Sequence, residues 1–330
     1  MFTLATINQQ GSPLPVIETG GRYWRLADVA PELLQPEPRR GLLNIFGNWN
    51  VAEPKLVALA SALAEGKAGA APIGTPTPGQ FSAPLQYPNK LLCAGANYYE
   101  HLRLDAGVTD FRKENNVPPF FMKPATTSLV GSGKTVRFPP QTEKLDYEVE
   151  LIAVIGKGGR KISEEDALDR VAGYTIGLDM SAREWQFHHK HLFKADLFGG
   201  KAFDDSCPAG PRIVPARFVD PQNLHLRLWV NGELRQDAST ADMIWSVAEL
   251  VSAISTHITL EPGDMLMTGS PAGVGLPTGR YLKIGDVVEA EMPETGRLTV
   301  ELVEDPEKQS TAYARSAFVT GKVGMPDRGR

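Results

Sequence analysis

The sequence predicts an α+β protein that is rich in strands, and three observations lead to this fold class. Short apolar or alternating segments of strand length outnumber the amphipathic segments of helical length. The two kinds of segment do not alternate strictly, as they would in a doubly wound parallel sheet. The 32 glycines and 26 prolines among 330 residues exceed the average shares of roughly 7% and 5%, which indicates many turns and short elements.

Short strands and one helix are expected before residue 70. The helix is the amphipathic segment Pro54–Ala64, and the strands are Phe2–Ile7, Leu14–Glu18 and Arg22–Leu26. Residues 71–88 contain five prolines and two glycines, which is typical of an extended connector because proline lacks a backbone donor and restricts the chain. We therefore predict a small N-terminal domain with a proline-rich linker over residues 1–80, and a larger domain over residues 81–330.

Strands dominate the second part of the chain. The predicted strands are Lys90–Ala94, Phe120–Lys123, Tyr147–Ile155, Val171–Asp179, Leu224–Val230, Met265–Gly269 and Val287–Met292. The pair Asn231-Gly232, directly after one of them, is typical of a hairpin turn. Three helices are predicted, at Glu164–Arg170, Ser181–Lys190 and Thr240–Thr256, the last with Thr240 as its N-cap.

Residues 102–118 form a polar, charged and irregular segment between a possible helix and a strand. A connection of this length inside a domain is uncommon unless it is functional or disordered. Because the segment directly follows His101, we predict that it forms a lid over a site containing this histidine.

Composition and charge argue against several classes of function. The formal net charge of −5 and the absence of a dense run of Lys or Arg argue against nucleic-acid binding. The densest apolar run, Leu151–Ile155, is far shorter than the roughly 18 residues that span a bilayer, and the N-terminus lacks the features of a secretory signal. Cys93 and Cys207 lie far apart in the sequence and indicate buried thiols in a reducing compartment. We therefore predict a cytoplasmic protein that binds neither nucleic acid nor membrane.

Two segments resemble known catalytic motifs without meeting their requirements. Gly131–Thr135 ends like a phosphate-binding loop, but Ser128 stands where that loop requires glycine, and prolines at 139 and 140 prevent the helix that must follow. Gly269–Gly273 resembles the turn that presents a nucleophilic serine, but its central residue is Pro271. Neither a nucleotide site nor a serine hydrolase is therefore expected.

Two glutamates at the start of an apolar strand are the first candidates for a functional site. Side chains alternate along a strand, so Glu148 and Glu150 point to one face, roughly 7 Å apart. The apolar run Leu151–Ile155 follows them, which indicates burial, and buried like charges require a cation or a shared proton. A solvent-facing stripe on an edge strand is the alternative that this segment alone leaves open.

A third carboxylate belongs to Asp179, which ends the apolar strand Val171–Asp179 and precedes a polar helix start. Three carboxylate oxygens suit Mg²⁺, Mn²⁺ or Ca²⁺ better than Zn²⁺. Three protein ligands on an octahedral ion leave positions for substrate and water, so a catalytic metal site is feasible.

Seven ordered motifs over about residues 90–305 resemble those of the fumarylacetoacetate hydrolase superfamily. They lie at Cys93–His101, Phe120–Pro124, Leu145–Leu151, Gly173–Gln186, Lys201–Pro211, Val230–Gln236 and Pro262–Gly275. The resemblance implies a β-rich catalytic domain with mixed sheets in a β-roll, and a homodimer. The N-terminal region loosely resembles the small extra domain of some members.

The resemblance also implies roles for individual residues. Glu148, Glu150 and Asp179 would bind one divalent ion, with Mg²⁺ expected first and Mn²⁺ or Ca²⁺ as alternatives. The ion would chelate a 2-oxo acid or a 1,3-dicarbonyl group, and His101 would activate water. Lys201 would stabilise the developing negative charge, and the residues expected to bind substrate or line its pocket are Arg183, Gln186, Lys123 and Thr268.

The spacing after His101 departs from the family pattern. The smaller enzymes of the superfamily often carry Glu three residues after the histidine, whereas this chain has Leu104 there. We expect Asp105 to be the acid partner of His101. Glu100 is the alternative, and a histidine without a carboxylate partner is the third option.

The function predicted from these residues is that of a metal-dependent hydrolase. It would cleave a carbon–carbon bond in an acylpyruvate or related 1,3-dicarbonyl oxo acid, in the breakdown of aromatic compounds or sugar acids. The first alternative is a 2-oxo acid decarboxylase, hydratase or isomerase that uses the same metal–enolate site. A metal-stabilised protein without catalytic activity is the second alternative.

Overall fold

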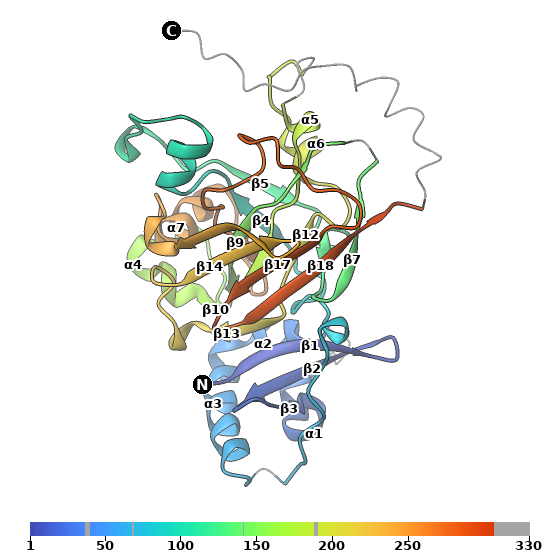
Figure 1. The fold of residues 1–330 in the computed structure, drawn as a ribbon. Coiled ribbons are helices and arrows are strands. Elements are labelled where there is room, and N and C mark those ends of the chain that lie inside the picture. The colour runs from blue at the N-terminus through green and yellow to red at the C-terminus, as the bar shows by residue number, and fades with distance from the viewer. Residues whose placement is uncertain (37–39, 68, 141, 188–190, 307–330) are drawn as a thin grey trace.

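A nine-stranded mixed sheet runs through the whole molecule (Figure 1). The computed structural model describes residues 1–36, 40–67, 69–140, 142–187 and 191–306. The strands lie in the order β3-β2-β1-β13-β10-β9-β16-β4-β5. Their bounds are β1 Thr3–Gln9, β2 Ser12–Thr19, β3 Arg22–Arg25, β4 Leu91–Ala94, β5 Phe120–Lys123, β9 Val149–Ile155, β10 Val171–Leu178, β13 Arg212–Pro215 and β16 Met265–Met267.

A second sheet of five strands packs against part of the first, in the order β15-β14-β17-β18-β7. Its bounds are β7 Lys134–Phe138, β14 His225–Val230, β15 Glu233–Ser239, β17 Val287–Met292 and β18 Gly296–Glu304. The predicted hairpin at Asn231-Gly232 joins β14 to β15. Two short ladders complete the strands, formed by β6 Leu129–Val130 with β12 Cys207–Pro208, and by β8 Leu145–Asp146 with β11 Ser181–Ala182.

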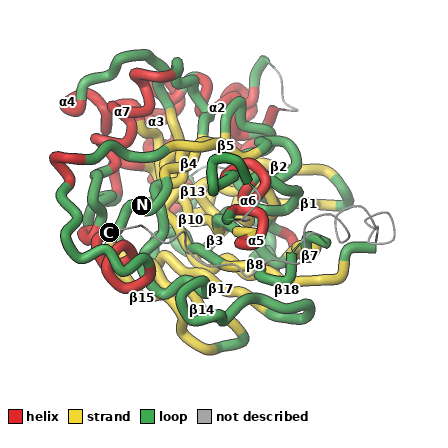
Figure 2. The backbone as a smooth tube through the Cα atoms, turned by 90° about the horizontal axis from the view of Figure 1, so that it is seen from above, coloured by secondary structure: helices red, strands yellow, loops and turns green. Residues whose placement is uncertain are grey.

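Helices are few and mostly short, which agrees with the glycine and proline content (Figure 2). The α-helices are α1 Leu26–Val29, α2 Leu42–Gly47, α3 Trp49–Ala64, α4 Glu164–Ala167, α5 Arg183–Gln186, α6 Leu197–Lys201 and α7 Val247–His257. Short 3₁₀ turns cover Pro31–Leu34, Pro78–Gln80, Lys113–Asn115, Leu168–Arg170, Ala216–Phe218 and Thr240–Asp242, and a π-helical turn covers His101–Asp105. Among the residues that the structure describes, no helix is long and apolar enough to cross a membrane. The strand-rich α+β fold class is confirmed.

Both faces of the central strand β9 are buried, which explains its nearly continuous apolar sequence. Val149, Leu151 and the other odd-numbered side chains pack in a core shared with the five-stranded sheet. Ile152 and Val154 pack in a second core, together with α2, α3 and the N-terminal strands. Because side chains alternate, Glu148 and Glu150 lie on the side of this second core, at the end of the strand that the N-terminal helices do not cover.

The N-terminal strands extend the central sheet. Strand β1 pairs antiparallel with β13, with Leu4 opposite Ile213. The linker also contacts these strands, since the Ser82 backbone N–H donates to Thr6 O at 2.9 Å. The division into domains at residue 80 remains a prediction.

Three predicted helices differ from those observed. Helix α7 begins at Val247, because Thr240 belongs to a separate 3₁₀ turn and Ser246 forms a capping box with Glu249. The helix predicted at residues 181–190 is limited to α5, since residues 181–182 pair with β8, and residues 188–190 lie outside the described part of the chain. Helix α3 begins at Trp49, five residues before the predicted start.

Candidate active site

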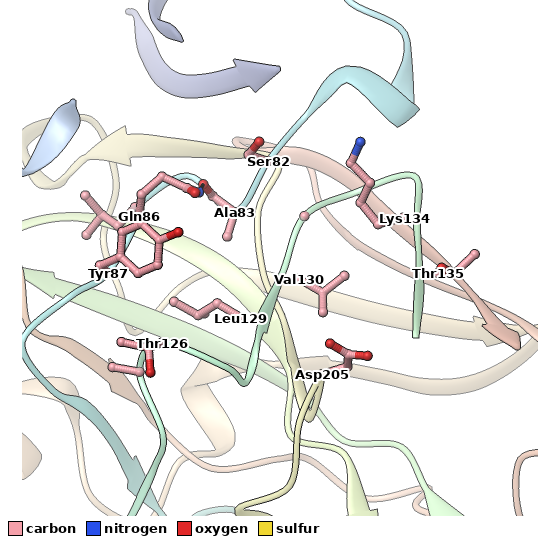
Figure 3. Close-up of a pocket in the computed structure, with 13 residues that line it drawn as sticks. Ser82, Ala83, Gln86, Tyr87, Thr126, Leu129, Val130, Lys134, Thr135 and Asp205 are labelled. Carbon is pink, nitrogen blue, oxygen red and sulfur yellow. Dashed lines mark hydrogen bonds between the residues drawn. The ribbon is translucent and has the colours of Figure 1, made fainter. Parts of the chain in front are cut away.

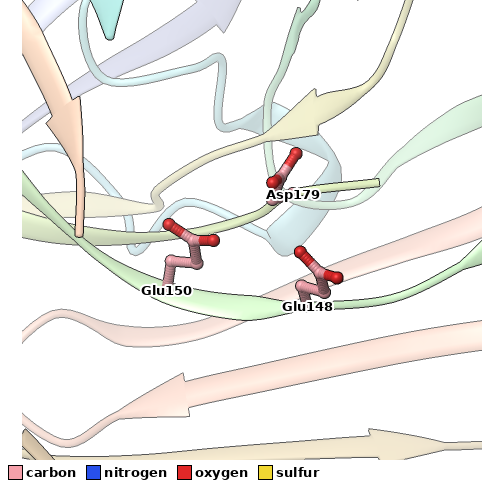
Figure 4. Close-up of side chains that lie close together, drawn as sticks. All are labelled: Glu148, Glu150 and Asp179. Atoms are coloured by element: carbon pink, nitrogen blue, oxygen red, sulfur yellow. The ribbon is translucent and has the colours of Figure 1, made fainter. Parts of the chain in front are cut away.

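Three carboxylates meet at the ends of β9 and β10 because of the register between these strands. Leu178 pairs with Val149, so Asp179 comes opposite Glu148, and the Asp179 backbone N–H donates to Glu148 O at 2.8 Å. Opposite residues share a face of the sheet, as do Glu148 and Glu150, which are two residues apart. Each residue offers an oxygen within 4.8 Å of the other two, and all three are buried. Figure 4 shows how the three side chains lie next to one another.

Three buried cations surround these carboxylates. Lys201, at the end of α6, places Nζ 2.5 Å from both Glu148 Oε2 and Asp179 Oδ2. Lys123, at the end of β5, places Nζ 2.8 Å from Asp179 Oδ1. The Arg183 guanidinium, at the start of α5, pairs with Glu148 Oε1 through Nη2. The sheet therefore supplies the anions, and the segments packed over its end supply the cations.

The two glutamates have opposite electrostatic environments. Burial opposes ionisation of Glu148, but Lys201 and Arg183 outweigh it and hold the pKa of this carboxyl well below its ordinary value. Burial raises the pKa of Glu150 well above its ordinary value, and the charges of Asp179 and Glu148 raise it further. The Gly269 backbone N–H donates to Glu150 Oε2 at 2.8 Å and opposes this shift only in part. Glu150 is therefore the carboxyl that gains most from an added cation.

The donor set fits a hard divalent ion. Lys123 Nζ directs hydrogen bonds at three backbone carbonyls, those of Met180, Lys201 and Ser206. Asp179 Oδ1 therefore lies beside this ammonium without accepting a hydrogen bond, and it is a buried oxygen with an unused lone pair. Together with Glu150, which pairs with no cation within the described part of the chain, it provides the oxygen ligands that Mg²⁺ and Mn²⁺ prefer.

Asp146 contacts the predicted site residues, and the sequence analysis did not assign it a role. It is fully buried, and its Oδ2 accepts a hydrogen bond from Arg183 Nε at 2.9 Å. Arg183 Nη1 donates to Gln186 Oε1 at 2.8 Å, which joins the two predicted substrate-binding side chains. Asp146 therefore fixes the orientation of Arg183. Asp146 lies in the motif Leu145–Leu151, two residues before Glu148, and this position was the sequence signal that could have identified it.

The histidine and its acid partner lie on the π-helical turn His101–Asp105. His101 Nδ1 lies 2.7 Å from Asp105 Oδ2. The turn is wider than in an α-helix, since the Ala106 N–H bonds to His101 O, five residues back. Glu100 instead accepts hydrogen bonds from Arg103, and the Leu104 side chain is 55% exposed. The structure thus places Asp105, the expected candidate, beside the ring.

The loop that follows β16 contacts both the carboxylate cluster and the pair His101–Asp105. The Gly269 N–H donates to Glu150, and the Gly273 N–H donates to Asp105 Oδ2 at 3.0 Å. Both glycines have positive φ, +93° and +102°, and a Cβ would lie 2.5 Å from Asn97 Cβ or 2.2 Å from Arg235 O. Only glycine therefore allows the loop to approach both sites.

Gln236 holds this loop against the metal-site strand, and the sequence analysis did not assign it a role. Its side chain is buried, and Oε1 accepts from the Val149 N–H at 2.9 Å, between the two glutamates. Its Nε2 donates to Ser270 Oγ at 2.9 Å and to Pro271 O at 2.8 Å. One amide therefore links the strand that carries Glu148 and Glu150 to the loop that holds Asp105.

A cavity of about 310 Å³ opens between these groups. The predicted site residues that line it are His101, Asp105, Glu148, Arg183, Gln186 and Lys201. Glu150 and Asp179 are not among the lining residues and lie next to Glu148 in the carboxylate cluster. Lys123 and Thr268 do not line the cavity. Lys123 is hydrogen-bonded to the three backbone carbonyls named above, and the Thr268 hydroxyl donates to Leu151 O at 2.9 Å. The roles of all these residues remain predictions.

A second cavity, of about 270 Å³, contains none of the predicted site residues (Figure 3). The linker contributes Ser82 and Gln86, and Lys134 and Asp205 lie on the other side. Lys134, part of the segment that resembles a phosphate-binding loop, begins strand β7 and donates Nζ to Gly79 O at 2.6 Å. The strand confirms that no helix follows this segment.

The predicted lid, residues 102–118, contacts the rest of the protein beyond Asp105 as well. Phe111 packs edge-on against Trp245, with ring centroids 6.0 Å apart. Lys113 Nζ lies 2.5 Å from Glu249 Oε1. Movement of this segment with ligand remains a prediction.

Comparison with known sequences places these residues in a family. Residues 90–303 match the family model described as "Fumarylacetoacetate (FAA) hydrolase C-terminal". The chain is 40% identical over 228 residues to the mitochondrial oxaloacetate tautomerase fahd2 of Xenopus laevis, covering 67% of each chain.

Solved structures of hydrolases are also similar. Maleylpyruvate hydrolase from Sphingobium sp. SYK-6, in complex with manganese(II) and pyruvate, aligns with a TM-score of 0.70 at 27% identity over 92% of this chain and 99% of that one. Fumarylpyruvate hydrolase from Pseudomonas aeruginosa, in complex with Mn²⁺ and pyruvate, aligns with a TM-score of 0.59 at 36% identity over 68% and 92%. The motifs, the fold and these matches agree, and the chain belongs to the fumarylacetoacetate hydrolase family.

Proposed function

We propose that this protein is a divalent-metal-dependent hydrolase that cleaves a carbon–carbon bond in an acylpyruvate. One observation carries the proposal: the pair His101–Asp105, the Lys201 ammonium and the carboxylate Glu148 line the same cavity. Water activation and enolate stabilisation can therefore act on one small molecule. The similar maleylpyruvate and fumarylpyruvate hydrolases support this reaction class.

The histidine is oriented for proton transfer from water. Its Nδ1 is held by Asp105, which leaves Nε2 to accept a proton. Water adds to the carbonyl of the acyl group, and the bond between that carbon and the adjacent CH₂ breaks. The electron pair of this bond passes to the CH₂ carbon and gives the enolate of pyruvate. Protonation at that carbon gives pyruvate, and the acyl group leaves as a carboxylic acid.

The buried cations act on the charge that develops in this step. The Lys201 ammonium, which lines the cavity, stabilises negative charge on the enolate oxygen. Arg183, fixed by Asp146, orients the substrate together with Gln186. A divalent ion held by Glu148, Glu150 and Asp179 would supply Lewis acidity at the 2-oxo acid end of the substrate.

The ion, the assembly and the location are further parts of this proposal. Mg²⁺ is the first choice and Mn²⁺ the second, because buried carboxylate oxygens suit both. We propose a homodimer in the cytoplasm, although the name of the Xenopus laevis relative places that protein in mitochondria.

A tautomerase acting on oxaloacetate is the second candidate, and the 40% identity to a protein of that name favours it. Tautomerisation moves a proton between carbon and oxygen and needs no water. A 2-oxo acid decarboxylase or hydratase could use the same enolate-stabilising residues.

Product analysis separates these reactions. The protein with Mg²⁺ or Mn²⁺ is incubated in ¹⁸O-water with an acylpyruvate and, separately, with oxaloacetate. We expect stoichiometric pyruvate and a carboxylic acid that contains ¹⁸O. Faster keto–enol conversion of oxaloacetate without acylpyruvate cleavage would favour the tautomerase, and release of CO₂ would favour the decarboxylase. No turnover of any substrate would leave a metal-stabilised protein without catalytic activity.

A further inference from the structure

We infer that the cavity selects acylpyruvates with an apolar acyl tail and rejects those whose tail ends in a second carboxylate. The inference rests on the proposed function and adds the substrate class. It differs from what the named relatives suggest, because oxaloacetate, maleylpyruvate and fumarylpyruvate each carry two carboxylates.

Charged and apolar side chains line the cavity together. The charged or polar ones include His101, Asp105, Glu148, Arg183, Gln186 and Lys201. Large apolar side chains come from five separate segments and are Leu102, Phe121, Phe187, Leu197, Val274 and Leu276. An acyl tail held in this cavity therefore contacts apolar side chains.

The cations of the cavity are already paired with protein carboxylates. Within the described part of the chain, the basic side chains that line it are His101, Arg183 and Lys201. Arg183 pairs with Asp146 and Glu148, and Lys201 pairs with Glu148 and Asp179. His101 pairs with Asp105. Each of the three therefore already has a carboxylate partner within the protein.

Charge balance in the buried cluster leads to the same result. Lys123, Lys201 and Arg183 face four carboxylates, those of Asp146, Glu148, Glu150 and Asp179. A divalent ion gives this cluster an excess of one positive charge, which one substrate carboxylate neutralises. A second carboxylate would be buried against apolar side chains without a partner, and burial of an unpaired charge is strongly unfavourable.

Two substrates that differ in one terminal group test the inference. Butanoylpyruvate and succinylpyruvate have the same number of carbons, and the terminal methyl of the first is a carboxylate in the second. We expect kcat/KM to be at least about tenfold higher for butanoylpyruvate. An equal or higher value for succinylpyruvate would overturn the inference and leave the proposed hydrolase intact.

Binding provides a readout that does not depend on turnover. 2-Oxohexanoate and 2-oxohexanedioate differ in the same way and lack the bond that would be cleaved. Isothermal titration calorimetry of the protein with Mg²⁺ should give a Kd about tenfold lower for 2-oxohexanoate. If neither acylpyruvate is cleaved but this preference is found, the proposed function fails and the inference stands. If the dicarboxylate binds as tightly, the inference fails.

A new cation in place of an apolar lining side chain should reverse the preference. Leu197→Arg places a guanidinium at a partly exposed lining position, and we expect it to shift the kcat/KM ratio at least about tenfold toward succinylpyruvate. Phe198→Arg is the matched control, because this side chain is on the same helix, is 74% exposed and does not line the cavity. Leu276→Arg is a second test should Leu197→Arg fail to fold. An equal shift in Phe198→Arg, or none in a folded lining variant, would contradict the inference.

Discussion

The carboxylate cluster, through Glu148, and the pair His101–Asp105 line one cavity, but the two groups are built in different ways. Glu148, Glu150 and Asp179 take their positions from the regular pairing of two central strands, and all three are buried. His101 and Asp105 lie on an irregular turn at the surface, and a loop with two glycines of positive φ supports Asp105. The comparison indicates that the sheet positions the charged groups of the site, whereas turn and loop geometry positions the proposed proton-transfer group.

The first way to test this division is to remove a ligand from the sheet. Glu150→Gln should lower Mg²⁺ affinity by at least about 100-fold and abolish turnover, because the amide keeps the volume and loses the charge. The fold should survive in EDTA, since the raised pKa of Glu150 means that a neutral group suits this position. Calorimetric titration with Mg²⁺ and thermal melting measure the two effects.

Glu301→Gln is the control for this experiment. Glu301 is exposed on β18, so the same substitution should leave Mg²⁺ affinity unchanged. Full turnover of Glu150→Gln after exhaustive chelation would show that the carboxylate cluster is not a metal site.

Substitutions of His101 or Asp105 should lower turnover without changing Mg²⁺ affinity. His101→Ala should cut turnover by roughly 10²–10⁴ and leave Mg²⁺ affinity unchanged, because the ring transfers protons and is not a predicted ligand. Asp105→Asn should approach this loss, and the double variant should lose little more, since the two residues act as a unit. Steady-state kinetics and Mg²⁺ titration of the same samples measure both.

Glu100→Gln is the matched control within the same turn. Glu100 pairs with Arg103 at the surface, so its substitution should leave kcat unchanged. Wild-type turnover of Asp105→Asn with a loss in Glu100→Gln would reverse the assignment of the acid partner.

Gln236 connects the two regions, and its substitution should affect both by a smaller amount. Gln236→Leu should lower kcat about tenfold and weaken Mg²⁺ binding several-fold, because Val149 and the 270–271 loop lose a common anchor. Gln222→Leu is the control, since Gln222 also joins two backbone groups but lies elsewhere, at Thr240 and Val247. A similar loss of Tm in both variants, with loss of kcat confined to Gln236→Leu, would support a positioning role. Equal kcat values would refute it.

The smallest expected effect is a pH dependence of the stability that Mg²⁺ adds to the folded protein. In protein stripped with EDTA, the folded state raises the pKa of Glu150, so this group favours folding below its ordinary value of 4.5 and loses that contribution as pH rises through the raised value. Mg²⁺ needs the ionised carboxylate, so the Tm difference between Mg²⁺ and EDTA samples should grow by a few degrees from pH 5 to pH 8. The pKa of Glu148 is lowered, so its contribution to stability changes only below its ordinary value of 4.5 and is constant between pH 5 and pH 8. A Tm difference that does not change with pH in the unmodified protein would contradict this account. In Glu150→Gln, which has no carboxyl to titrate at this position, we expect the Tm difference to be independent of pH.

The sequence predicted the strands of the metal site more completely than their surroundings. The apolar runs around Glu150 and before Asp179 identified β9 and β10, because strands buried on both faces have this composition. Strand β13, Arg212–Pro215, was not predicted, since it has four residues and its partners β1 and β10 come from distant parts of the chain. Helix α7 was predicted seven residues too early, because Thr240 and Ser246 are both suitable caps.

Site residues that act through backbone contacts could not be found from the sequence. Gln236 and Asp146 were present in the motifs, but their roles depend on which backbone N–H groups the fold brings to them. The Asp105 assignment was made from chain distance alone, and the π-helical turn that brings it to His101 has no simple sequence signal.

The three buried cations beside the carboxylates affect the order in which this protein matures. Two carboxylate oxygens within 4.8 Å of each other repel by at least roughly 3 kcal/mol at an effective dielectric constant of 20, which would oppose folding if no cation were near. Lys123, Lys201 and Arg183 belong to the same chain and reach the cluster as it folds. The nascent chain can therefore complete its fold before it binds the proposed ion, unlike small zinc domains that fold only around their metal. Loading and loss of this ion would then be exchange steps of a folded protein, set by the supply of free metal in its compartment.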